Sequence, residues 1–250
     1  MSVQIGYWAD HVKHPYFRQK VDLVENFCGW DALKELLSYA SPWRDQPFIA
    51  CLFQTGGRVS ETLALRKNNF ILKESDKVLL VENMMLLKRY KKLKEPIDGK
   101  TTERIVSFRK KFPISLTEPL TPIIQNWIQE LRNKEGKETN FLLFKSSYKL
   151  GEPLSRHWAY WTIRKLDSEI SDTLRETLGL NKPLLDKHGN EVKDKLHLWL
   201  HFFRSQRASA LVDLYGFSVL DLIDFFSWKR ADTAVTYARR GWKGLADKMR

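Results

Sequence analysis

The sequence predicts an α+β fold that is mostly helical and carries one small antiparallel sheet. Apolar residues recur at helical spacing in several segments, the strongest of which spans residues 198–215. Two short β-like runs, at residues 77–81 and 104–108, flank a polar and basic stretch that contains Pro96 and Asp98-Gly99. Runs of this kind predict two antiparallel strands with a long basic connection.

The same periodicity predicts the remaining elements. Residues 113–120 are expected to be a linker, and residues 141–144 a short strand or turn. One helix is expected to begin near Val59, after two glycines that end the helix before it. The other helices are expected at residues 31–39, 46–54, 121–131, 155–170, 219–226 and 233–239.

Length and composition favour a folded protein without a membrane span. The 250 residues can bury a core, and 43% hydrophobic residues argue against disorder. No apolar run approaches the roughly 20 residues that a membrane span needs, and the N-terminus lacks the apolar stretch of a signal peptide. We expect a soluble cytoplasmic protein with one domain at 31–241, an N-terminal extension at 1–30 and a tail at 242–250.

The charge balance is the first indication of a partner. The formal net charge of +12 attracts polyanions and releases counterions when it meets phosphates. Charge alone fits a generically basic protein equally well. The two cysteines, Cys28 and Cys51, are too few for a zinc site, and no Cys-x-x-Cys motif occurs. We expect neither a metal nor a cofactor.

Much of the excess charge lies between Lys88 and Lys111, where ten basic residues stand against three acidic ones. A connection this cationic suits contact with a DNA groove or backbone. For most of these lysines, however, a solvated loop explains the charge as well. The residues expected to contact DNA from this segment are Arg89, Lys91, Lys92 and Lys94.

A glycine pair precedes an arginine at the start of a predicted helix. In the run Thr55-Gly-Gly-Arg58, the glycines allow the backbone to turn and bring the Arg58 guanidinium close to a ligand. Glu61 follows at i+3, so its carboxylate can orient Arg58. An ion pair on a helix surface is an equally good explanation of this segment alone.

Two more motifs lie in the last quarter of the chain. His201 and Arg204 stand at i and i+3, so both can point at one phosphate from one helix face. Tyr237 follows Trp228 by nine residues on a late helix. Taken singly, these are better explained as a core histidine beside a surface arginine and as a tyrosine that packs in the core.

In their order along the chain, these motifs resemble the signature of the tyrosine recombinase (phage-type integrase) family. That signature is an arginine in a Thr-Gly-x-Arg-x-x-Glu context, a lysine in a β-hairpin, a His-x-x-Arg helix, a His or Trp, and a tyrosine. Phe144 followed by Gly151-Glu-Pro-Leu-Ser155 also resembles a family segment. The resemblance covers roughly residues 30–241 and implies the fold of the family's catalytic domain. The matching residues are Arg58, Glu61, Lys88, His201, Arg204, Trp228 and Tyr237.

The chain departs from the family pattern at three points. Phe226-Ser227-Trp228 stands where the family usually has Leu-Gly-His. Several lysines lie near the expected hairpin tip; we rank Lys88 first, because it follows an apolar run directly, and Lys91 second. Arg58 comes too early to leave room for the helical core-binding domain that usually precedes the catalytic domain. Either the chain is a fragment or the enzyme is minimal and clamps DNA differently.

The resemblance implies a chemistry. Arg58 and Arg204 would bind the scissile phosphate, oriented in part by Glu61, and Tyr237 would attack it to leave a 3′-phosphotyrosyl link and a free 5′-hydroxyl. The link stores the bond energy, so rejoining needs neither a metal nor ATP. Lys88 would protonate the leaving oxygen.

Four other roles follow from the resemblance and the helix pattern. His201 would act as a base or a phosphate ligand, because an imidazole exchanges protons near neutral pH. Trp228 would hydrogen-bond the phosphate or support the site. Glu61 would stand behind Arg58, and Arg207 would contact DNA. We therefore predict a site-specific recombinase or integrase of a prokaryotic or viral mobile element. We expect it to act on double-stranded DNA as a homotetramer, with a monomer as the alternative in free solution.

Two alternatives stay open. A type IB topoisomerase uses the same chemistry but relaxes DNA as a monomer. A catalytically idle DNA-binding protein of the same fold would keep the architecture without the reaction. The presence of Arg58, His201, Arg204 and Tyr237 argues against the idle protein.

Overall fold

The computed structural model describes residues 27–97, 100–180, 184–185, 191–192, 198–229 and 231–238. Within these, the side chains at 87–97, 100–107, 184–185, 191–192, 236 and 238 are outside the description. The helices are α3 (Trp30–Ser38), α4 (Asp45–Thr55), α5 (Val59–Leu63), η2 (Lys67–Asn69), α6 (Thr121–Glu135), α7 (Arg156–Glu169), α8 (Asp172–Thr177), α9 (Leu200–Tyr215), α10 (Val219–Phe226) and α11 (Ala231–Ala238). The strands are β1 (Phe70–Lys73), β2 (Val78–Ile97), β3 (Lys100–Ser115), β4 (Leu184–Leu185) and β5 (Glu191–Val192).

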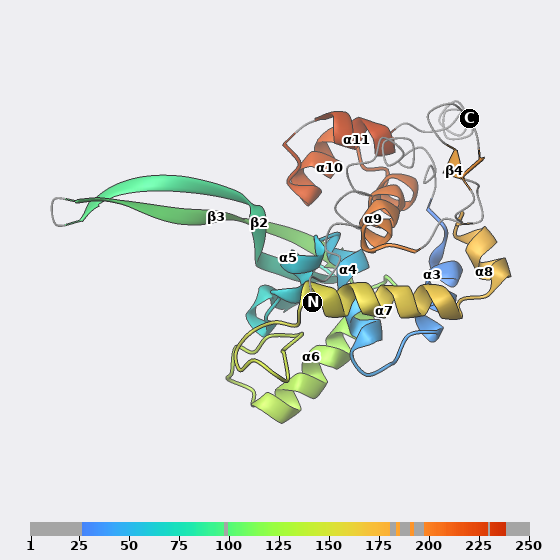
Figure 1. Ribbon diagram of the computed structural model, residues 1–250, viewed down its shortest axis with the longest axis horizontal. Helices are drawn as coiled ribbons and strands as arrows, with labels where there is room; N and C mark the ends of the chain where they lie inside the picture. The colour runs from blue at the N-terminus through green and yellow to red at the C-terminus, as the bar shows by residue number, and fades with distance from the viewer. Residues whose placement is uncertain are drawn as a thin grey trace.

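A helical body carries a long β-hairpin that projects from one side (Figure 1). Helix α4 lies at the centre of the body, where it packs against α9, α6 and α5. Every residue from Pro47 to Thr55 is buried, as expected for a helix that is apolar on all sides. Pro47 stands in its first turn, and Gly56 ends it in the left-handed conformation.

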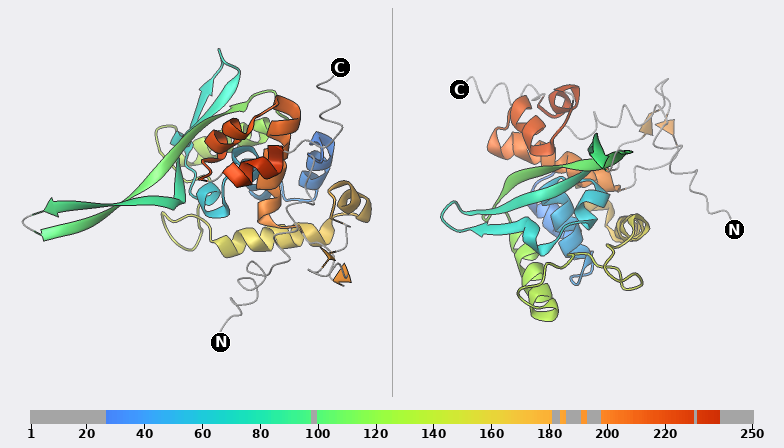
Figure 2. Two further views of the ribbon diagram at one scale, coloured as in Figure 1. Left: turned by 90° about the horizontal axis from the view of Figure 1, so that it is seen from above. Right: turned by 90° about the vertical axis from the view of Figure 1, so that its left-hand side faces the viewer.

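Helix α9 lies against α4 although five of its buried residues are polar or charged. Its buried polar set is Arg204, Ser205, Gln206, Arg207 and Ser209. Helices α10 and α11 pack on each other, and α11 also packs on α9 (Figure 2). Helix α11 is thereby brought back to α9, where Tyr237 contacts Ser205.

The sheet has the order β1-β2-β3, and both pairs of strands are antiparallel. The β2–β3 ladder runs from Val78 opposite Ser115 to Ile97 opposite Lys100, with register shifts between Val81 and Met84 and between Leu86 and Tyr90. The end of the hairpin near Val78 and Ser115 is anchored in the helical body, and the strands extend from there well beyond the helices (Figure 2).

The predicted fold class, mostly helical with a small antiparallel sheet, is confirmed. The helices expected at 31–39, 46–54, 155–170 and 219–226 are all present, with ends within one residue of the prediction for most of them. The helix expected at 121–131 continues to Glu135. Among the described residues, no helix combines the length and hydropathy needed to cross a membrane.

The prediction was wrong about the connections around the sheet. The basic stretch after residue 81 is not a loop, because strand pairing continues through it to Ile97 and Lys100. The expected linker at 113–120 begins with strand, since Pro113 pairs with Leu80 inside β3. Proline is tolerated there because β3 is the outer strand of the sheet, where one side of the backbone needs no partner.

Candidate functional site

A tight turn at Gly56 and Gly57 connects α4 to α5 at the centre of the candidate site. Gly56 has φ of 53°, and a Cβ there would lie 2.3 Å from Cε1 of Phe226. A Cβ on Gly57 would lie 2.3 Å from Cε of Met84 and 2.8 Å from Oγ1 of Thr62. Gly56 therefore requires glycine, for its left-handed conformation and for the close approach of α10, whereas a side chain at Gly57 would have to displace the end of Met84 and the Thr62 hydroxyl.

This turn delivers Arg58 to the first position before α5. The Glu61 carboxylate accepts from the Arg58 backbone N–H through Oε2 (2.8 Å) and from the Arg58 guanidinium Nη1 through Oε1 (2.9 Å). Glu61 is 1% exposed while the Arg58 side chain is 38% exposed. The buried carboxylate thus holds the helix end and the guanidinium together, and part of the guanidinium stays accessible to a ligand.

Arg204 comes from the opposite side, on α9, and is buried. Its Nη1 donates to the carbonyl of Gly56, and its guanidinium carbon lies 4.7 Å from the ring centre of Phe226. Its Nη2 is buried and has no hydrogen-bond partner in the described part of the chain. Burial, and next the charge of Arg58, lower the pKa of Arg204 to about 10, so it stays cationic at neutral pH.

Tyr237 on α11 belongs to the same cluster. Its ring stacks on Trp228 at 5.5 Å between centres and 16° between planes, and the guanidinium of Arg204 lies 5.6 Å from the Trp228 ring centre. The phenol oxygen lies 3.0 Å from Oγ of Ser205, the residue after Arg204. Burial raises the pKa of Tyr237, while the Ser205 hydrogen bond and the charge of Arg204 act in the opposite direction.

A buried lysine that sequence reasoning did not single out completes the cluster. Lys110 on β3 is 5% exposed, and its Nζ donates to the carbonyl of Thr55 at 2.9 Å. Its amine also lies 4.3 Å from the ring centre of Phe112. In the sequence Lys110 is one of ten basic residues between 88 and 111, and no local pattern distinguishes it from the others.

The structure brings together four of the predicted site residues, Arg58, Arg204, Trp228 and Tyr237, with Glu61 behind Arg58. His201 is exposed in the first turn of α9, one helical turn before Arg204. Lys88, the lysine we ranked first, lies in β2 where the register shifts between Leu86 and Tyr90. The side chains of Lys88, Arg89, Lys91, Lys92 and Lys94 lie outside the described residues.

The solved structures that this chain is similar to include recombinases. No family model matches the sequence, and no curated protein matches it. The chain is similar to the XerH site-specific recombinase bound to its difH substrate (15% identity, TM-score 0.48, 88% of this chain and 51% of that chain). It is also similar to XerA recombinase (17%, 0.48, 87% and 61%) and to the Tn1549 transposon integrase in complex with transposon right end DNA (15%, 0.44, 81% and 57%).

The chain thus spans about half to three-fifths of the length of the solved structures it matches. At these identities and TM-scores the likeness does not assign an activity. The geometry of the site has to supply the functional evidence.

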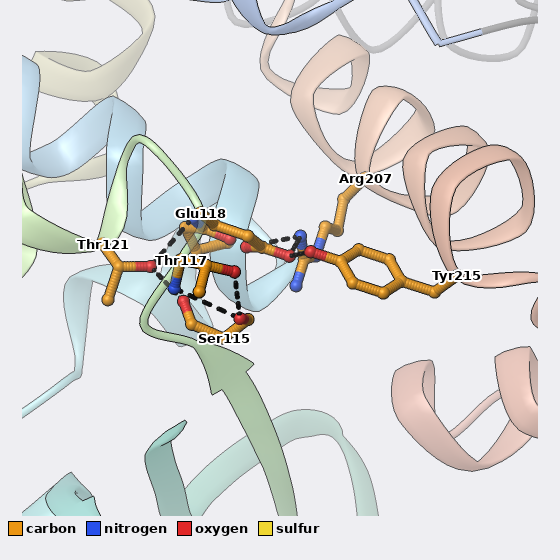
Figure 3. Close-up of polar contacts among 7 residues, drawn as sticks. Ser115, Thr117, Glu118, Thr121, Arg207 and Tyr215 are labelled. Carbon is orange, nitrogen blue, oxygen red and sulfur yellow. Dashed lines mark hydrogen bonds and ion pairs between the residues drawn. The ribbon is translucent and has the colours of Figure 1, made fainter. Parts of the chain in front are cut away.

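Arg207, which we predicted to contact DNA, is instead part of a buried network (Figure 3). Its Nη1 lies 2.8 and 2.9 Å from the two carboxylate oxygens of Glu118, and the Tyr215 hydroxyl donates to Glu118 at 2.6 Å. Arg207 is 1% exposed, and its guanidinium carbon lies 5.6 Å from the ring centre of Phe53 and 5.5 Å from that of Phe225. A DNA contact is incompatible with this arrangement, because it would require the ion pair to break and the side chain to leave the core.

The charges in this part of the core do not balance. Arg58 pairs with Glu61, and Arg207 pairs with Glu118. Among the described residues, Arg204 forms no ion pair. A buried cation is costly unless a charge of opposite sign accompanies it, so the site favours an anionic ligand. The described residues contain no cluster of three or more His, Cys, Asp or Glu side chains suited to a metal ion.

Proposed function

We propose that this chain breaks and rejoins DNA as a site-specific recombinase, with Tyr237 as the nucleophile. One observation carries the proposal: the phenol of Tyr237 is hydrogen-bonded to Ser205 beside Arg204, whose buried Nη2 has no partner among the described residues. A buried donor without an acceptor is costly, and a phosphodiester oxygen would satisfy it. The same ligand would supply the negative charge that the cluster lacks.

Two guanidinium groups from different elements support binding of a single phosphate. Arg204 is fixed through the Gly56 carbonyl, and Arg58 is fixed through Glu61. Guanidinium groups bind phosphate oxygens with short, charge-assisted hydrogen bonds and stay protonated at any working pH. Held in advance around the phosphorus, they would stabilise the charge that builds up on the non-bridging oxygens during attack.

The environment of Tyr237 suits a nucleophile that is neutral at rest. Burial raises its pKa, so the phenol keeps its proton in the empty site, while Arg204 favours the charged form. In the reaction, the phenol oxygen would bond to phosphorus as the bond to the 5′-oxygen breaks. The phenol would lose its proton, and the leaving oxygen would gain one.

We propose His201 as the group that accepts the phenol proton or binds the phosphate, and Lys88 as the group that protonates the 5′-oxygen. Trp228 would support the nucleophile through its stacked ring. The phosphotyrosyl ester would keep the energy of the broken bond, so that the 5′-hydroxyl can restore the DNA without ATP.

The basic hairpin supports double-stranded DNA as the partner. Ten of the 24 residues from 88 to 111 are basic. Lys110 is buried at the base of the hairpin, but the greater part of this segment lies in strands that project from the body (Figure 1). We propose that Arg89, Lys91, Lys92 and Lys94 contact the DNA backbone. We also propose that the protein works as a homotetramer on DNA, in the cytoplasm of a cell that hosts a mobile element.

The test is covalent trapping on a library of nicked suicide duplexes, in which the short fragment that leaves with the free 5′-hydroxyl diffuses away, so that rejoining is prevented. We expect a protein–DNA band that resists denaturant, that disappears in Tyr237→Phe and that persists in Tyr215→Phe, a matched loss of one tyrosine hydroxyl on α9. DNA binding should survive in both variants. Sequencing the trapped DNA would identify the target site.

Two other outcomes would replace the proposal. A wild-type protein that binds the duplexes and never forms the band would be an idle DNA-binding protein. Relaxation of supercoiled DNA by a monomer, without strand-exchange products, would identify a topoisomerase.

A further inference from the structure

Lys110 is a buried titratable group for which the proposed reaction has no use. It lies at the base of β3, opposite Met84 of β2, and points its amine into the space between β3, α4 and α10. The rings of Phe112 and Phe225 lie 4.3 and 5.7 Å from Nζ. Lysine is almost never fully buried without a charged partner, so this position calls for an explanation.

A hydrogen bond connects Lys110 to the turn of the proposed phosphate site. Lys110 Nζ donates to the carbonyl of Thr55, and Arg204 Nη1 donates to the next carbonyl, that of Gly56. The last carbonyls of a helix have no partner within the helix and need one from outside. Lys110 and Arg204 thus secure adjacent peptide groups at the end of α4, directly before Arg58.

The charges that face Lys110 come from two helices. Arg58 and Glu61 lie on and before α5, and Arg204 and Arg207 lie on α9. Glu61 is already paired with Arg58, and Arg207 with Glu118, so an ammonium at Lys110 would add a positive charge without a carboxylate of its own. Burial, and next the charge of Arg204, lower the pKa of Lys110 well below its usual value.

We propose that Lys110 is a positioning residue of the phosphate site, which holds the turn as an uncharged amine when the site is empty and takes up one proton when a phosphodiester binds. This inference rests on the proposed function, because it requires a phosphate beside Arg204. The incoming negative charge offsets the guanidinium groups around Lys110. The proton comes from solvent, and the amine keeps its N–H bond to Thr55 in both states.

Linked protonation gives a pH dependence with a defined sign. Because Lys110 would bind its proton only in the complex, DNA binding should weaken as the pH rises. The change should occur between the pKa of Lys110 in the empty site and its higher pKa in the complex. For one proton the limiting slope is about tenfold in affinity per pH unit. Without a titratable group at position 110, this part of the slope should vanish.

The test counts protons directly. Calorimetric titrations of a library duplex that the protein binds into Tyr237→Phe protein, which cannot react, are run in two buffers of different ionisation enthalpy at neutral and mildly alkaline pH. We expect protein with Lys110 to take up about one proton more than the same protein with Lys110→Gln. The glutamine amide can still donate to Thr55, so the turn is retained while the titration is lost.

Lys111→Gln is the matched control, because Lys111 is the next residue of β3, 64% exposed and paired with Glu82. It should weaken DNA binding slightly and leave the proton count unchanged. Affinities of wild type and Lys110→Gln should converge as the pH rises. Lys110→Met, which loses the bond to Thr55 as well, should slow covalent trapping more than Lys110→Gln at every pH, with Tm measured for each variant.

Equal proton uptake with and without Lys110 would overturn the proton-uptake part of the inference. Trapping rates in Lys110→Met equal to wild type would overturn the positioning part. Failure of the proposed function looks different: no covalent band forms in any protein, whereas DNA binding and its proton count can still be measured. Should Lys110→Met fail to fold, Lys110→Gln alone decides the first part.

Discussion

Two arginines one turn apart on α9 show how differently a buried guanidinium can be used. Arg207 is 1% exposed and contacts both oxygens of Glu118, which also accepts from Tyr215. Arg204 is 3% exposed, donates to the Gly56 carbonyl, and has an Nη2 without a partner in the described chain. The Arg207 guanidinium has its counter-charge within the protein, whereas Arg204 keeps a donor that the proposed phosphate would satisfy.

The comparison separates a guanidinium that is paired within the fold from one that we propose binds a phosphate. A buried ion pair contributes little compared with apolar packing, but losing one partner is costly because the other charge stays buried. A buried cation without a carboxylate partner differs, since removing it leaves no opposite charge unpaired. Substitution of Arg207 should therefore lower mainly the free energy of unfolding, whereas substitution of Arg204 should lower mainly the rate of DNA cleavage.

The largest effect is expected for Arg207→Met. Glu118 would lose its cation while buried, so the free energy of unfolding should fall by about 3–5 kcal/mol. Chemical denaturation would measure it. In the double variant Arg207→Met with Glu118→Gln, much of this loss should be recovered; a double variant as unstable as the single one would show that packing, not charge, sets the effect.

Arg204→Met should reverse this pattern. Covalent trapping should slow by roughly 10²–10³-fold, the usual cost of removing one donor that stabilises the transition state. The free energy of unfolding should fall much less than in Arg207→Met, because no carboxylate is left without its cation and only the Gly56 carbonyl loses a donor. If Arg204→Met instead unfolded the protein as readily as Arg207→Met, the two arginines would both be structural, and the contrast would be lost.

Gly56→Ala should affect both properties, because the turn serves both the fold and the site. A Cβ at 2.3 Å from Phe226, on a residue with φ of 53°, should cost about 1–3 kcal/mol of stability. The carbonyl that holds Arg204 would shift with the turn, so trapping should slow as well. Gly136→Ala is the control, because a Cβ on Gly136 would lie 3.5 Å from its nearest neighbour, Oγ1 of Thr139. Gly136 also has a positive φ, so this variant measures the cost of the backbone conformation without the clash.

The smallest effect is expected for Tyr215→Phe. Loss of the hydroxyl that donates to Glu118 should cost about 1 kcal/mol, because the tyrosine is partly exposed. Burial and the neighbouring carboxylate raise the pKa of Tyr215 in the folded state. Its contribution is therefore present below pH ~10 and is lost as the pH rises further.

The stability of wild type should consequently decline more steeply than that of Tyr215→Phe in alkaline solution. The difference should not exceed about 1.4 kcal/mol per pH unit, the limit for one proton. Denaturation curves at several alkaline pH values would measure it. Identical slopes would mean that the hydroxyl does not sense Glu118.

The sequence predicted most of the helices because their ends are marked locally. Ser155 at the start of α7 accepts from the backbone N–H of Trp158, and Ser218 and Asp221 cap α10 reciprocally. It did not predict the length of the hairpin. The basic residues after Leu86 carry no alternating pattern, and strand pairing there follows from the partner strand, which local pattern cannot reveal.

The site was predictable only where its residues form motifs. The ordered resemblance identified Arg58, Arg204, Trp228 and Tyr237, which the fold does bring together. Arg207 was assigned to DNA because a buried partner 89 residues away leaves no local trace. Lys110 was overlooked for the same reason, since its importance comes from Thr55 across the core and not from its neighbours in the chain.

The hydrogen bond between Tyr237 and Ser205 joins two residues of a single chain. If that chain cuts DNA as proposed, each protomer cleaves with its own tyrosine and takes no nucleophile from a neighbouring protomer. A variant without the Tyr237 phenol and a variant without the Arg204 guanidinium would then both be inactive. Mixing them should not restore DNA cleavage. Assembly could synchronise the copies, but it would not be needed to complete any one of them.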